Sequence, residues 1–118
     1  MKLDKADTTF SKYIRLRDDY TCQRCHRKSE SVACSHFFGR TGESTRYDPD
    51  NCVTLCYGCH QYFDETNREA YRDFKLKQLG EKGFNALKLR ANLYKKKDRK
   101  MSLLIAKMLL KEEEQKYV

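Results

Sequence analysis

The stretch NCVTLCYGCH, residues 51–60, decides the fold, because it joins a short β-type run to two cysteines and a histidine. Val53 and Thr54 are β-branched, which favours a strand. Cys56 and Cys59 have the C-x2-C spacing of a metal-binding knuckle. A cysteine-based metal site does not need a histidine directly after its second thiol. The stretch therefore indicates two sites that share one segment of chain.

A matching knuckle, Cys-Gln-Arg-Cys, precedes the second knuckle and is separated from it by 30 residues. Four thiolates complete the tetrahedral coordination of Zn²⁺ and leave no open position, which is typical of a structural site. His26 follows the first knuckle and is interpreted as a loop residue exposed to solvent. The two other cysteines, Cys34 and Cys52, are interpreted as small buried strand residues rather than as ligands. The predicted zinc ligands are Cys22, Cys25, Cys56 and Cys59.

The composition indicates a small basic protein with a modest core. Of its 118 residues, 39% are hydrophobic and 36% are charged, with a formal net charge of +8 and a pI of about 9.2. A short polar chain gains from a bound metal, and a basic chain favours an anionic partner such as nucleic acid. The alternative is a soluble basic protein without such a partner. No apolar run reaches the roughly 20 residues of a membrane span, and residues 1–10 contain no apolar h-region, so we expect no export by a signal peptide.

The order of the expected elements is that of an α+β protein. A short helix is expected over residues 10–18, capped by one of residues 7–9, after a loose lead-in over residues 1–8. Two short strands follow, SVACSHFF and CVTL, and the rest of the chain is helical. We expect one domain over residues 1–118, with a zinc-stapled core at about 20–66 and a basic helical extension at about 67–118. The expected later helices cover about 57–65, 68–79, 84–94 and the segment after KKKD, with Gly80 ending the second.

A second site is predicted beside the zinc site. Neighbouring helical residues are turned about 100° from each other, so if Cys59 faces the zinc, His60 faces elsewhere. Asp64 lies four residues on and shares the face of His60. A histidine and a carboxylate can bind a divalent cation, and His36, on the first strand, would then lie across from them. An imidazole beside a hydrated cation can act as a general base on water.

The letters SHF, followed by DNCVTLCYGCH, resemble the HNH or ββα-metal endonucleases. His36, Asn51 and His60 occupy the positions of the family's His, Asn and His, at intervals of 15 and 9 residues. The flanking segments FSKYIRLRDDYTCQRC and FKLKQLG…FNALKLRANLYKKKDRK resemble the phage NinG (Rap) recombination-nuclease type. The resemblance implies a ββα-metal core that carries a structural zinc and a catalytic Mg²⁺ or Mn²⁺. The missing export signal and the unpaired cysteines separately predict a reducing, cytoplasmic location, in the host cell if the chain is phage-encoded.

The resemblance also implies a role for each residue of the motif. His36 would be the general base that activates water, His60 would hold the single catalytic cation, and Asn51 would order the loop and the histidine. Many members have an acidic residue or a histidine directly before the base, whereas this chain has Ser35. A hydroxyl is a weaker ligand than a carboxylate, so the predicted cation ligands are His60, Asp64 and, weakly, Ser35.

The predicted DNA contacts are basic and sequence-independent. Residues 88–100 hold seven basic residues and one acidic residue, with Tyr94 among them. Such a segment suits phosphate contacts, which position a protein on DNA without reading its sequence. The alternative is a solvated helix face. The predicted contact residues are Arg40, Arg46, Lys95, Lys96, Lys97 and Arg99.

The last expected helix carries an apolar stripe, Met101, Leu104, Ile105, Met108 and Leu109, at the spacing of one helix face. This stripe is typical either of a helix face buried in the core or of a surface that contacts a partner. The partner could be a second copy of this chain, which would make a homodimer.

Three functions remain open at this point. The first is a metal-dependent endonuclease that hydrolyses phosphodiester bonds in branched or recombining DNA with little sequence specificity. The second is a non-catalytic zinc module that binds DNA or a protein partner. The third is a structural zinc protein that dimerises. Ser35 favours the last two, whereas His36 together with His60 favours the first.

Overall fold

The computed structural model describes residues 3–117 and has an α+β fold. Its centre is a two-stranded antiparallel sheet of β1 (Ala33–His36) and β2 (Cys52–Leu55), in which His36 pairs with Cys52 and Ala33 pairs with Leu55. The second strand has the predicted bounds, CVTL, and the first is the central part, ACSH, of the predicted run SVACSHFF. Helices surround the sheet: α1 (Lys5–Arg17), α2 (Glu43–Arg46), the 3-10 turn η1 (Pro49–Asn51), α3 (Tyr57–Gln61), the π-helical turn η2 (Tyr62–Thr66), α4 (Arg68–Ala91) and α5 (Arg99–Gln115).

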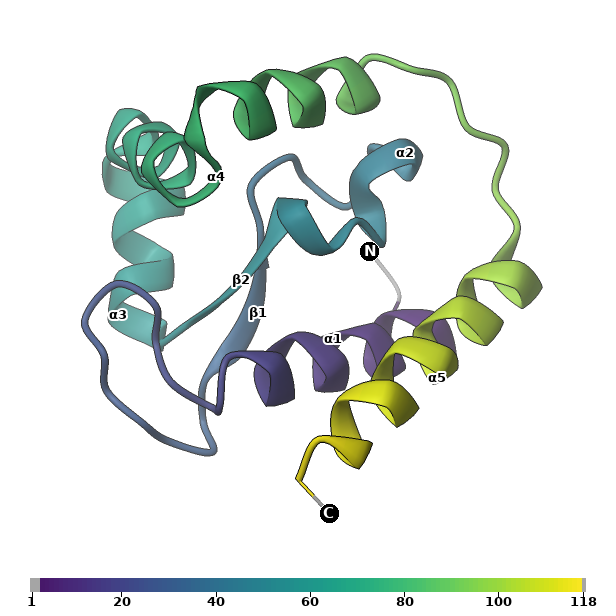
Figure 1. Cartoon of the computed structure of the whole chain (residues 1–118). Coiled ribbons are helices and arrows are strands. Elements are labelled where there is room, and N and C mark those ends of the chain that lie inside the picture. Colours follow the sequence, from purple (N-terminus) through teal and green to yellow (C-terminus); the bar gives the residue numbers. More distant parts are fainter. Residues whose placement is uncertain (1–2, 118) are drawn as a thin grey trace.

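The sheet separates two apolar clusters, because successive side chains of a strand point to opposite faces. On one face Cys34 and Cys52 pack against Phe10 and Ile14 of α1. On the other face the strand residues pack against α3, η2 and α4, in a cluster built on Val53, Leu55, Phe63, Tyr71 and Phe84. Figure 1 shows this order, with α1 and α5 on one side of the strands and α3 and α4 on the other.

Helix α1 starts earlier than the sequence predicts. Asp4 is its N-cap, and a capping box is complete: the Asp4 carboxylate accepts from the Asp7 backbone N–H at 3.0 Å, and the Asp7 carboxylate accepts from the Asp4 N–H at 3.0 Å. The predicted cap at residues 7–9 was therefore wrong by one turn. Of the predicted loose lead-in, residues 1 and 2 lie outside the described residues and Lys5 already belongs to the helix.

Helix α4 is bent at the glycine that the sequence marks as a helix end. Gly80 has φ of 75° and ψ of 169°, whereas the residues on both sides are helical. A positive φ is accessible to glycine at little cost, because glycine has no Cβ. The predicted boundary at Gly80 is thus confirmed as a sharp bend between two helical segments, the second of which ends at Ala91.

Helix α5 packs along α1 through small residues and leaves most of its apolar stripe in solvent. Ser102 and Ala106 are buried, Ala106 and the stripe residue Leu109 pack with Phe10 and Ile14 of α1, and α5 lies beside α1 in Figure 1. Four residues of the predicted stripe are between 44% and 55% exposed: Met101, Leu104, Ile105 and Met108. The stripe is therefore surface for the most part. The homodimer through this helix stays a prediction.

Over residues 3–117, none of the helices combines the length and the apolar character that crossing a bilayer requires.

Candidate metal and catalytic centre

The four knuckle cysteines come together as the sequence predicts. The sulfur atoms of Cys22, Cys25, Cys56 and Cys59 all lie within 4.8 Å of one another, and those of Cys25 and Cys56 are 3.7 Å apart. Four thiolates at this spacing can hold a metal ion such as zinc in a closed tetrahedral site. His26 is exposed and does not belong to this group, as expected of a loop residue.

Backbone contacts join the first knuckle to the sheet. The Gln23 N–H donates to the Thr54 carbonyl at 3.0 Å, and the Cys22 N–H donates to the Arg27 carbonyl at 2.8 Å. His26 has φ of 67°, the left-handed conformation that turns the chain back after the knuckle. The first knuckle is thereby fixed to β2, directly beside the second knuckle at its end.

The second knuckle forms the start of α3, and this sets the direction of His60. Cys56 is the N-cap residue of α3, and Cys59, in its first turn, is buried among the four thiols. His60, turned by one helical residue, points instead to a cleft on the other side of the helix. The imidazole of His60 is thus separate from the thiol group, as the sequence predicts.

One cleft of about 450 Å³ contains both histidines of the predicted motif. His36 lines it from the end of β1, His60 from α3 and Asp64 from η2. Two arginines line the same cleft. The side chains that give the cleft its chemistry are His36, His60, Asp64, Arg40, Arg68 and Cys34.

His36 is held by a backbone carbonyl. Its Nε2 lies 2.9 Å from the Arg46 carbonyl oxygen, which can only accept, so Nε2 carries the proton and Nδ1 has the free lone pair. Burial, followed by the positive charge of Arg40, lowers the pKa of His36 to about 4. The ring is therefore neutral at pH 7. Nδ1 is buried, and no group of residues 3–117 donates a hydrogen bond to it.

Asp64 contacts two basic residues, His60 and Arg68. Its Oδ2 lies 2.6 Å from Nε2 of His60, and its Oδ1 lies 3.1 Å from Nη1 of Arg68. All three side chains are partly exposed at the mouth of the cleft. In the described chain, neither His60 nor Asp64 belongs to a group of three or more closely spaced metal-ligating side chains. A cation at this pair would complete its coordination with water or substrate oxygen.

Asn51 organises the loop that follows β1. It is fully buried at the end of η1, and its Nδ2 donates to the carbonyls of Phe38 and Thr45 at 2.9 and 3.0 Å. Its Oδ1 accepts from the Phe38 N–H at 2.8 Å. These bonds fix the chain directly behind His36, which is the positional role that the resemblance implies for the asparagine.

Ser35 lies away from the cleft. It is buried, and its hydroxyl is 2.7 Å from the Tyr71 hydroxyl, on the face of β1 opposite to His36. It does not line the cleft with His60 and Asp64. The structure therefore does not bring Ser35 to the predicted cation ligands, and the donors that remain are His60 and Asp64.

Two of the arginines predicted to contact DNA form ion pairs with carboxylates of the protein itself. Arg46 is buried and forms a two-bond ion pair with Asp7, with Nε to Oδ1 at 2.8 Å and Nη2 to Oδ2 at 2.6 Å. Arg99 pairs with Asp4 at 2.6 Å and with Glu43. Both guanidinium groups neutralise carboxylates, so these two predictions need correction: Arg46 and Arg99 anchor elements rather than offer free charge.

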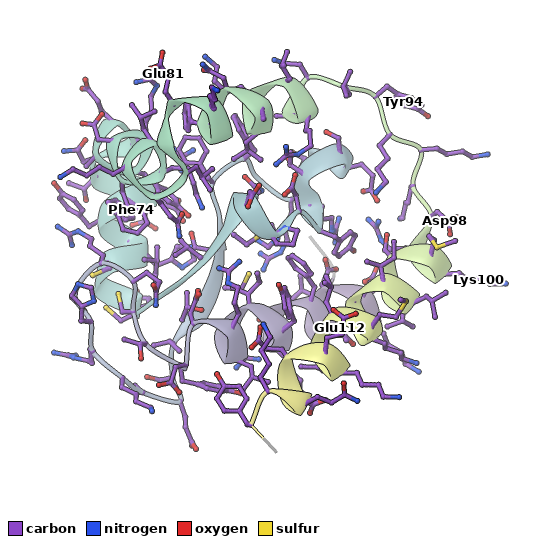
Figure 2. The ribbon with its side chains drawn as sticks, viewed as in Figure 1. Phe74, Glu81, Tyr94, Asp98, Lys100 and Glu112 are labelled. Carbon is purple, nitrogen blue, oxygen red and sulfur yellow. The ribbon has the colours of Figure 1, made fainter. Side chains whose placement is uncertain are left out.

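The other predicted contacts are accessible. Lys95, Lys96 and Lys97 are exposed on the extended segment between α4 and α5, and Arg40 lines the cleft. Tyr94, on the same segment, is 91% exposed and points away from the body of the protein in Figure 2. The segment thus presents a tyrosine and three lysines to solvent.

Three functional features were not predicted. Arg68 lines the cleft and donates to the Phe37 carbonyl at 2.8 Å, and its i,i+4 spacing from Asp64 was the available signal. Lys75 is buried and donates to the Asp50 carbonyl at 2.8 Å, which ties α4 to η1. Cys34 and Cys52 are buried, as predicted, but they also form a group with His36 whose ligand atoms lie within 4.8 Å of one another: Cys34, His36 and Cys52.

No family model, curated protein or solved structure matches this chain.

Proposed function

We propose that this protein is a metal-dependent DNA endonuclease that hydrolyses phosphodiester bonds by a one-metal mechanism of the HNH type. The observation that carries the proposal is the shared cleft, in which His36 of β1 lies with His60 and Asp64 beyond the second knuckle. The proposed ββα-metal core is β1, β2 and α3, in that order along the chain. The four thiols would hold a structural zinc that fixes α3.

His36 has the hydrogen bonding of a general base. The Arg46 carbonyl holds the proton on Nε2, so Nδ1 can accept a proton from water. That water attacks phosphorus, a new P–O bond forms, and the bond from phosphorus to the leaving oxygen breaks. Because Nδ1 is buried, the proposal requires the ring or a neighbouring cleft side chain to shift when DNA enters.

His60 and Asp64 would hold the catalytic cation, which when bound stabilises charge on the phosphate and the leaving oxygen. A nitrogen and a carboxylate oxygen suit Mn²⁺ better than Mg²⁺, because Mg²⁺ prefers oxygen ligands. We therefore expect higher activity with Mn²⁺. Arg40 and Arg68 would attract the phosphate to the cleft.

The DNA would be held mainly through its backbone. Lys95, Lys96 and Lys97 are free to contact phosphates, and Tyr94 can stack on an unpaired base. Among the described residues we find no helix or ribbon that has the features of a base-reading module. Weak sequence preference and a preference for branched DNA are therefore expected, with selection by DNA shape.

A plasmid assay tests the proposal. The full chain is incubated with supercoiled plasmid and Mn²⁺ or Mg²⁺, and nicking is compared between wild type, His36→Ala and His60→Ala. The matched control is His26→Asn, because His26 is exposed and asparagine tolerates its left-handed backbone. Nicking by wild type and by the control, lost in both other variants, is expected. Equal nicking by His36→Ala would refute the role of His36.

A non-catalytic zinc module that binds DNA is the second candidate. The buried Nδ1 of His36, the engagement of Asp64 by two basic residues and the position of Ser35 favour it. DNA binding without nicking under any divalent cation would support this candidate over the first. A comparison of a four-way junction with linear duplex tests the preference for branched DNA, and equal rates on both would end that part of the proposal.

A further inference from the structure

We propose that Cys34, His36 and Cys52 form a second metal site, for a thiophilic divalent cation such as Zn²⁺. The three side chains offer two sulfurs and one imidazole nitrogen, and these ligand atoms all lie within 4.8 Å of one another. Two thiolates and one imidazole match the ligand set of three-ligand zinc sites that keep a fourth position open.

The register of the sheet creates this group. His36 and Cys52 are paired directly across the two strands, so their side chains leave the sheet on the same face. Cys34 lies two residues before His36 and points to that face as well. A shift of the register by one residue would place Cys52 on the opposite face. The group therefore depends on backbone pairing and not on flexible side chains.

The surroundings of His36 suit a metal ligand. In metal sites a ligating histidine usually donates its second ring N–H to a carboxylate or a backbone carbonyl, which fixes the ring. Nε2 of His36 has this bond with the Arg46 carbonyl at 2.9 Å. Nδ1 is buried and has no hydrogen-bond partner among residues 3–117. A buried lone pair without a partner is unfavourable, and a metal ion would satisfy it.

The charge of the Cys34, His36 and Cys52 group and its access from the cleft also agree with a bound divalent cation. Two thiolates neutralise a divalent cation, so the filled site adds no net charge beside Arg40. Both sulfurs are buried, whereas Cys34 and His36 line the cleft, which gives an ion a path inward and leaves room for a water as fourth ligand. The competing explanation is that Cys34 and Cys52 only fill space beside Phe10 and Ile14.

On the proposed nuclease function, a metal ion bound at this site would inhibit catalysis. The same imidazole cannot bind a metal ion and accept a proton from water. A filled second site would therefore remove His36 from catalysis, and an excess of Zn²⁺ would inhibit nicking through this site.

Metal counting tests the site itself. The full chain is reduced under anaerobic conditions and titrated with Co²⁺, and bound metal is followed by its d–d bands and its thiolate charge-transfer absorption. We expect the thiolate charge-transfer absorption to saturate at two Co²⁺ per wild-type chain, and at one in Cys52→Ala and in His36→Gln, with the bands of the four-thiolate site retained. A cation at His60 and Asp64 has no thiolate ligand and adds nothing to this absorption. The control is Thr54→Ser, a conservative change on the same strand face, which should still bind two.

The outcomes separate the alternatives. Saturation of the thiolate absorption at one Co²⁺ in wild type, or at two in Cys52→Ala, would overturn the second site. Circular dichroism checks that each variant is folded, and Cys34→Ala replaces Cys52→Ala if the latter is not. In the nicking assay, excess Zn²⁺ should inhibit wild type but spare Cys52→Ala, and equal inhibition of both would overturn the inhibitory role. If wild type never nicks DNA, the nuclease proposal fails while the metal count still decides the site.

Discussion

Removing the Asp7 carboxylate should destabilise the protein more than any single surface change, because Asp7 has two structural roles. It closes the capping box of α1, and it pairs with Arg46 through two short hydrogen bonds. The exposed fractions of the two side chains are 2% for Asp7 and 7% for Arg46. Asp7→Ala would leave the Arg46 guanidinium buried without its counter-charge.

The burial of the Asp7–Arg46 pair sets the expected loss in the free energy of unfolding. Breaking a buried ion pair by removing one partner costs about 3–5 kcal/mol, since the remaining charge stays desolvated. For a chain of this length, 1 kcal/mol corresponds to a Tm change of about 4 °C, so we expect Tm to fall by about 12–20 °C. The Arg46 carbonyl also holds His36, so the variant should lose order at the cleft as well.

Thermal and urea denaturation, followed by circular dichroism, measure this change. The matched control is Asp73→Ala, because Asp73 is an exposed helical aspartate that forms no ion pair with the described residues. It should change the free energy of unfolding by less than about 0.5 kcal/mol. A loss of under about 1 kcal/mol in Asp7→Ala would refute the assignment of a buried, paired carboxylate.

The same pair predicts a pH dependence. Burial alone would raise the pKa of Asp7, but hydrogen bonds from Arg46 and from the Asp4 backbone outweigh it and hold the pKa well below its usual range. A group whose folded pKa is lowered contributes stability above its unfolded pKa and loses it as pH falls. The difference in unfolding free energy between wild type and Asp7→Ala should therefore shrink below about pH 4.

Four further predictions follow from other contacts. Asn51→Ala removes three hydrogen bonds to the backbone of Phe38 and Thr45, at about 1 kcal/mol each, and should cost about 3 kcal/mol in urea denaturation, whereas a cost near zero would contradict the clamp behind His36. Cys25→Ser should lower zinc affinity, so that helical circular dichroism is lost at lower chelator concentration than in wild type; an unchanged chelator midpoint would argue against the four-thiolate site. Burial lowers the pKa of Lys75 to about 8, so the folded state binds fewer protons than the unfolded state between about pH 8 and 10.5. Stability of wild type relative to Lys75→Met should rise across that window, and a flat difference would contradict the lowered pKa. Lys96→Ala should reduce the slope of log K against log salt for DNA binding by about one, and no change in slope would exclude Lys96 from phosphate contact.

The sequence was most informative where the signal is local. Two C-x2-C knuckles, a β-branched run and a glycine at a helix end each depend on a few neighbouring residues. They predicted the thiol group, β2 and the bend at Gly80. The position of His60 away from the thiols followed from helical geometry alone. The hairpin expected between the two knuckles also predicted that His60 and His36 lie on opposite sides of one cleft.

The sequence was least informative where a partner lies far along the chain. Arg46 pairs with a residue 39 positions away, and Arg99 with one 56 positions away, so composition alone could not show that their charges are used internally. The sequence left open whether the stripe on α5 is core or a surface that faces a partner, and four of its five residues are exposed. Close contact between two helices favours small side chains, and α5 therefore packs toward α1 with the buried Ser102 and Ala106, while Leu109 is the one stripe residue packed against the cluster of Phe10 and Ile14.

The packing of α5 against α1 affects how the protein is made. Helix α1 is synthesised early, but the helix that covers it emerges only after the sheet, both knuckles and α4. Tyr117 reaches back to the carbonyl of Leu16 at 3.2 Å, across 101 positions of chain. Contacts between such distant segments form late and slow the folding of a domain. On the ribosome, a nascent chain with its metal already bound would therefore still lack the part of the α1 cluster that Ala106 and Leu109 supply, and chaperones would have an incompletely covered apolar surface to bind until α5 arrives.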